Sequence, residues 1–64
     1  MYKYEVRFTS IEDGENFAEW CLANIYWINE SNEYNRAILT CKDNIYSALL
    51  SDECVVQFNW LKHN

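Results

Sequence analysis

The stretch YKYEVRFT, residues 2–9, alternates strictly between apolar and polar side chains. Its apolar side consists of Tyr2, Tyr4, Val6 and Phe8, and its polar side of Lys3, Glu5, Arg7 and Thr9. Period-two alternation in aromatic and β-branched residues is typical of a strand with one buried and one solvated face. We therefore predict a strand over residues 2–9 and expect another element to cover its apolar side.

The following segment predicts that cover, a helix from about residue 14 to residue 25. Asp13 is the expected N-cap residue, and Glu15 stands in the first turn, where a carboxylate is favourable. At 100° per residue the apolar side chains form one stripe, made by Phe17, Ala18, Cys21, Leu22, Ile25 and, at its end, Ile28. The end of this helix stays open, because IYWI at residues 25–28 prefers strands and is equally suited to begin a hairpin through residues 29–32.

The second half of the chain predicts two further strands with a short element between them. Residues 34–42, YNRAILTCK, carry apolar groups on both faces, which favours a central strand. Residues 43–51 favour a short helix that begins near Asp43, with a strand as the alternative. Residues 54–62 alternate again, with Val56, Phe58 and Trp60 on one side.

The expected fold class is α+β, in one compact domain that spans residues 1–64. An antiparallel sheet of three or four strands is covered on one face by one main helix. The expected order is strand, helix, one or two strands, short helix, strand. A chain of 64 residues leaves no room for a second core.

The charge of the chain restricts its partners. Ten acidic residues against five basic ones give a net charge of −5. The cations are scattered along the sequence, at Lys3, Arg7, Arg36, Lys42 and Lys62. Direct binding of nucleic acid is therefore not expected, since phosphate contacts need clustered cations, and a larger protein with a basic, nucleic-acid-binding surface is the favoured partner.

Hydropathy and cysteine usage bear on the compartment. No window approaches the roughly 18 apolar residues of a membrane span, so no membrane partner is expected. The N-terminal residues do not resemble a signal peptide, and three cysteines cannot all pair within the chain. We expect a cytoplasmic protein, in the host cell if the chain is encoded by a phage.

Catalytic and metal-binding patterns are not recognised in the sequence. The sole histidine, His63, is the penultimate residue, so a Ser or Cys nucleophile has no evident base. Cys21, Cys41 and Cys54 lack zinc-site spacing and fall in apolar segments, where free cysteine behaves as a small hydrophobe. We expect no enzyme activity, no cofactor and no metal.

One acidic stretch stands out as a candidate partner-binding surface. Helix capping accounts for Glu12, Asp13 and Glu15 but not for Glu19, which lies one turn after Glu15 as an unfavourable like-charge pair. If the helix continues far enough, Trp20 and Trp27 lie side by side next to these acids. The candidate site residues are therefore Glu12, Asp13, Glu15, Glu19, Trp20 and Trp27. Two alternatives stay open: that both indoles only close the edge of a small core, and that the charge only favours solubility.

Two classes of function follow from these features. In length, acidity and lack of catalytic residues, the chain resembles small phage-encoded proteins that block host enzymes or defence systems, anti-CRISPR proteins among them. This resemblance implies a non-catalytic inhibitor that covers a basic nucleic-acid-binding site. The alternative is an antitoxin or an accessory subunit that uses its aromatic face to form a homodimer or a larger complex.

Overall fold

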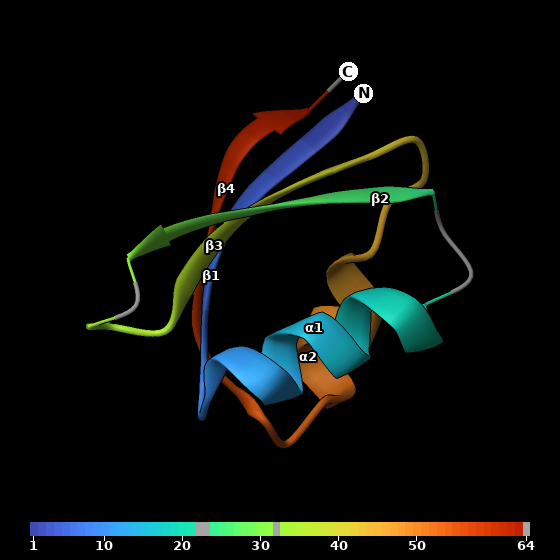
Figure 1. The fold of residues 1–64 in the computed structure, drawn as a ribbon. Helices are drawn as coiled ribbons and strands as arrows, with labels where there is room; N and C mark the ends of the chain where they lie inside the picture. Colours follow the sequence, from blue (N-terminus) through green and yellow to red (C-terminus); the bar gives the residue numbers. More distant parts are fainter. Residues whose placement is uncertain (22–23, 32, 64) are drawn as a thin grey trace.

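The computed structural model describes residues 1–21, 24–31 and 33–63. Its elements are, in chain order, β1 (Tyr2–Phe8), α1 (Ile11–Trp20), β2 (Ile25–Ser31), β3 (Arg36–Cys41), α2 (Tyr46–Ser51) and β4 (Val55–His63). The four strands form one antiparallel sheet in the order β2-β3-β1-β4, and both helices lie on the same side of it (Figure 1). The prediction of a small α+β fold with an antiparallel sheet is confirmed.

The strand order interlocks two strand–helix–strand units. β3 lies between β1 and β2, and β1 lies between β3 and β4. Each helix therefore connects two strands that are separated by a third, which is the split βαβ arrangement. β1 and β3 occupy the centre of the sheet, so their helix-facing sides form the middle of the core.

The core lies between the sheet and the two helices. Tyr4, Val6 and Phe8 are at most 1% exposed, which confirms the apolar side predicted for the first strand. The buried cluster consists of Tyr4, Val6, Phe8, Phe17, Ala37, Leu39, Cys41, Ile45 and Leu49. It takes one large residue from each helix, Phe17 and Leu49, so the main helix and the short one both cover the sheet.

Helix α1 begins and ends earlier than the sequence predicted. Its N-cap is Ser10, whose hydroxyl oxygen accepts a hydrogen bond from the Asp13 backbone N–H at 3.1 Å, and Asp13 lies in the first turn. Asp13 as N-cap was therefore wrong, because Gly14 suggested a break where the helix in fact continues. The helix ends at Trp20, so the predicted span of 14–25 was wrong at both ends. The part of that prediction that concerns residues 22 and 23, Leu22 included, lies outside the described residues.

The revised cap can be tested by comparing two substitutions. Ser10→Ala is expected to lower the free energy of unfolding by about 1 kcal/mol, because an amide of the first turn loses its acceptor. Asp13→Ala removes only a favourable charge near the helix start, worth about 0.3–1 kcal/mol. Urea denaturation followed by circular dichroism measures both, and a larger loss for Asp13→Ala would restore Asp13 as the cap.

Residues 25–31 form a strand and not the end of the first helix. Ile25 pairs with Cys41 and Trp27 with Leu39, so both side chains face the helices. The preference of β-branched and aromatic residues for strands prevails here, as the hairpin alternative required. Asn32, in the predicted hairpin turn, lies outside the described residues. β3 starts only at Arg36, because Asn35 adopts a positive φ of 53° in the preceding turn.

The last third of the chain follows its prediction except that the short helix begins at Tyr46 and not near Asp43, and that β4 has register shifts against β1. Residues 46–51 form α2, which confirms the short helix, and Asn44 Oδ1 accepts the Tyr46 N–H at 2.8 Å at its start. In β4, Arg7 pairs with Gln57 but Phe8 pairs with Val55, so one extra residue lies between them. Val56 is that residue and is 51% exposed, so its predicted place beside Phe58 was wrong and Val55 packs on the core instead.

Candidate functional site

The outward side of α1 carries three glutamates in one strip. Gly14 and Phe17 are the buried residues of this helix. Glu12, Glu15 and Glu19 are exposed and, at 100° per residue, lie within about 60° of one another around the axis. We call Glu12, Glu15 and Glu19 the acidic face.

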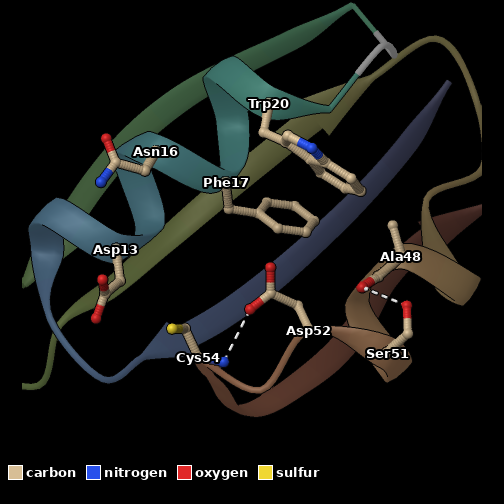
Figure 2. Close-up of a pocket in the computed structure, with 8 residues that line it drawn as sticks. All are labelled: Asp13, Asn16, Phe17, Trp20, Ala48, Ser51, Asp52 and Cys54. Atoms are coloured by element: carbon tan, nitrogen blue, oxygen red, sulfur yellow. Dashed lines mark hydrogen bonds between the residues drawn. The ribbon is translucent and has the colours of Figure 1, made fainter.

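A groove runs beside the acidic face, between α1 and the segment that carries α2 into β4 (Figure 2). It is lined by Asp13, Asn16, Phe17, Trp20, Ala48, Ser51, Asp52 and Cys54. Phe17 and Ala48 give it an apolar lining, while the carboxylates of Asp13 and Asp52 enter from opposite sides. Asp52 is held in place because its Oδ1 accepts the Cys54 backbone N–H at 2.8 Å.

Trp20 lies at the upper end of this groove and is 72% exposed (Figure 2). The same side chain lines a second hollow together with Asp43 and Ala48. An indole that closed the edge of the core would be mostly covered, so that alternative does not describe Trp20. A large exposed aromatic side chain next to carboxylates has the composition of a binding hot spot.

Trp27 does not belong to this surface. It lies on β2, on the core side of the sheet, with its ring centroid 5.8 Å from that of Phe8. Its indole also lies against Gly14 on the buried side of α1, opposite to the acidic face. Trp27 therefore fits the alternative in which an indole closes the core. The structure brings Glu12, Asp13, Glu15, Glu19 and Trp20 together and adds Asp52, which was not among the candidate site residues.

Charge is segregated between the two sides of the molecule. The helical layer, residues 10–21 and 43–54, contains Glu12, Asp13, Glu15, Glu19, Asp43, Asp52 and Glu53 and neither Lys nor Arg. The opposite face of the sheet carries Lys3, Arg7, Arg36 and Lys62, with Glu5 among them, as the strand register shows. These four cations are far apart in the sequence but lie on one face of the folded sheet. Their common face became visible with the pairing of β1 with β3 and β4.

Two titratable groups in the core, Cys41 and Tyr4, have raised pKa values that favour their neutral forms. Burial raises the pKa of the Cys41 thiol to about 11, so this thiol is protonated at neutral pH and is a poor nucleophile. Burial also raises the pKa of Tyr4, whose hydroxyl donates to Asn44 Oδ1 at 2.9 Å. Within the described parts of the chain, no group of three or more His, Cys, Asp or Glu side chains is placed to hold a metal ion.

Comparison of the chain with protein-family models, curated proteins and solved structures finds no match. In residues 1–21, 24–31 and 33–63, no helix has the length and apolar character needed to cross a membrane. Function is therefore inferred from the surface itself.

Proposed function

We propose that this chain is a small, acidic, non-catalytic protein-binding module. Its acidic face and the adjoining groove dock on a basic surface of a larger protein. The observation that carries the proposal is the helical layer, which contains seven carboxylates, neither Lys nor Arg, and the 72% exposed Trp20.

The two parts of this surface make different contributions to binding. Exposed carboxylates attract and orient a basic partner over about 10 Å at 0.1 M salt, which raises the association rate. The groove supplies short-range contacts, because Asp13 and Asp52 can accept hydrogen bonds from a guanidinium group while the Trp20 indole stacks beside it. An arginine side chain of the partner is therefore the best occupant of the groove.

The class of partner follows from the spacing of charge along a rigid helix. A basic protein surface that holds nucleic acid is selected for a row of negative groups, and the acidic face offers such a row. We infer that the chain acts as a phage-type inhibitor, anti-CRISPR-like in its mode of action, that covers this site without entering a reaction. It binds the protein and not the nucleic acid.

A second candidate function rests on an aromatic cluster at the β4 edge of the sheet. Tyr46 and Trp60 are 43% and 47% exposed, with ring centroids 6.3 Å apart, and Trp60 stacks on Tyr4. β4 is an outer strand, and an outer strand with exposed aromatic residues suits a subunit interface. In this alternative the chain is an antitoxin or an accessory subunit, and its association resists salt.

Charge reversal on α1 tests the inhibitor proposal. Glu15→Lys/Glu19→Lys is expected to weaken partner binding at least about tenfold, because attraction turns into repulsion at the centre of the interface. Both residues are exposed, so the circular dichroism spectrum should stay that of the folded protein. The partner is first captured from lysate by the tagged chain and eluted in steps of rising salt. Its affinity is then measured with purified proteins.

A matched control separates the site from net charge. Glu30→Lys/Glu33→Lys makes the same charge change at two exposed positions away from α1, one near the end of β2 and one in the turn before β3. It should retain most of the affinity. Equal losses in the two variants would leave only non-specific attraction, and capture of nothing but the chain itself at high salt would favour the subunit alternative.

A further inference from the structure

The face of the sheet that points away from the helices contains two cross-strand pairs of like charge. Arg7 is the direct partner of Arg36 on the two central strands, and Lys3 is the direct partner of Lys62 on β1 and β4. Partners in an antiparallel pair have Cβ atoms about 5 Å apart on the same face, and like charges there are destabilising. A small, marginally stable domain gains nothing for its own fold from this arrangement.

The Arg7–Arg36 pair is only partly neutralised within the protein. Glu5 is the sole carboxylate among the paired residues of this face, and its Oε2 lies 3.9 Å from Arg36 Nη1. Among the described residues, no carboxylate forms an ion pair with Arg7. The Arg36 Nε is buried and has no hydrogen-bond partner in the described structure. The guanidinium groups of Arg7 and Arg36 thus have one carboxylate near them, and it lies at salt-bridge distance from Arg36 alone.

These groups surround a hollow of about 320 Å³, lined by Glu5, Arg7, Tyr34, Arg36, Gln57 and Asn59. Gln57 extends the arginine row because it is the β4 partner of Arg7. Tyr34 stands at the rim, 51% exposed, with the Arg36 guanidinium carbon 5.6 Å from its ring centroid. The lining therefore combines two guanidinium groups, two side-chain amides, one aromatic ring and the carboxylate of Glu5.

We propose that this hollow is a binding site for a single phosphate group. A phosphate monoester carries about 1.5–2 negative charges near pH 7 and has three acceptor oxygens, so it can satisfy both guanidinium groups at once. A lone carboxylate offers less charge and one plane of acceptors. The net charge of −5 disfavours a long polyanion, so the ligand is a small phosphate compound. This site lies on the opposite side of the sheet from the acidic face and does not depend on the proposed function.

The test is a titration of the full chain at low ionic strength, monitored by ¹⁵N NMR. Inorganic phosphate is expected to give saturable shifts at Arg7, Arg36 and their strand neighbours. Arg7→Gln should weaken binding at least about tenfold, as expected for a lost charge-assisted contact. Lys62→Gln removes the same charge from the far end of this face and should change the affinity less than about threefold. Glu5→Gln should tighten binding, because it removes the competing carboxylate.

A second readout distinguishes a ligand site from a structural role. Without phosphate, Arg7→Gln should raise the melting temperature, since it relieves the repulsion with Arg36. If Arg7 instead stabilised the fold, the same substitution would lower the melting temperature.

Titration with a nucleoside 5′-monophosphate identifies the compound that carries the phosphate group. Tighter binding than that of inorganic phosphate indicates a nucleotide that stacks on Tyr34, and equal binding indicates free phosphate. The proposal is overturned if no saturation occurs at about 10 mM phosphate or if Lys62→Gln weakens binding as much as Arg7→Gln.

Discussion

Gly14→Ala is expected to lower the free energy of unfolding by about 2 kcal/mol, although alanine is the better helix former by about 1 kcal/mol. A Cβ at this position would lie 2.6 Å from Phe8 Cδ2 and 2.9 Å from Trp27 Cζ3, and nearer still to Trp27 Cη2. Phe8 is 1% exposed and cannot move aside, so α1 or the indole must shift. The overpacking cost exceeds the gain in helix propensity.

Thermal and urea denaturation measure this effect. For a domain of this size, 2 kcal/mol corresponds to a fall of about 8–16 °C in melting temperature. Asn16→Ala, an exposed position on the same helix, supplies the propensity gain without the contact and should be neutral or slightly stabilising. Adding Trp27→Leu to Gly14→Ala should cost less than the sum of the two single substitutions, because the smaller side chain makes room for the methyl group. A Gly14→Ala variant as stable as the parent would show that α1 does not pack this closely on β2.

The first strand and Gly14 show which parts of the fold the sequence could predict and which it could not. Alternation over residues 2–9 predicted β1 and its buried side, because period two has no competing explanation there. Gly14 was ambiguous, since a glycine marks either a helix boundary or a close approach, and only the position of the Trp27 ring decides between them. Choosing Asp13 as the N-cap in place of Ser10 moved the predicted start of the helix by three residues, and Trp27 was placed on the helix only on the condition that it continued past residue 25.

The candidate site likewise contains residues that local sequence patterns could place and residues that they could not. Local patterns were enough to place Glu12, Glu15 and Glu19 near one another, because their spacing within one helix sets their direction. Asp52 and the cations Arg7 and Arg36 depend on contacts between distant segments, and a one-residue bulge such as that at Val56 changes which residues meet. The polar side of the first strand already contained Lys3 and Arg7, and this was the signal from which a basic face could have been inferred.

Trp20→Ala is expected to leave the fold intact and to weaken partner binding by about 30-fold or more, which corresponds to about 2 kcal/mol. The side chain is 72% exposed, so little buried area is lost from the free protein and the free energy of unfolding should change by less than about 0.5 kcal/mol. In the proposed complex, the indole at the upper end of the groove would exclude water from the neighbouring charged contacts. Loss of that cover weakens every carboxylate–guanidinium contact beneath it.

The measurement pairs chemical denaturation with the affinity for the purified partner. Tyr26→Ala removes an aromatic side chain of similar exposure, 55%, from the opposite face of the sheet and should leave the affinity unchanged. Trp20→Phe should fall between the parent and Trp20→Ala, since benzene is a weaker partner for a cation than indole. If Trp20→Ala instead destabilises the fold by more than about 1 kcal/mol, the indole belongs to the core. If neither fold nor affinity changes, the carboxylates act alone, and binding must then disappear steeply as salt rises.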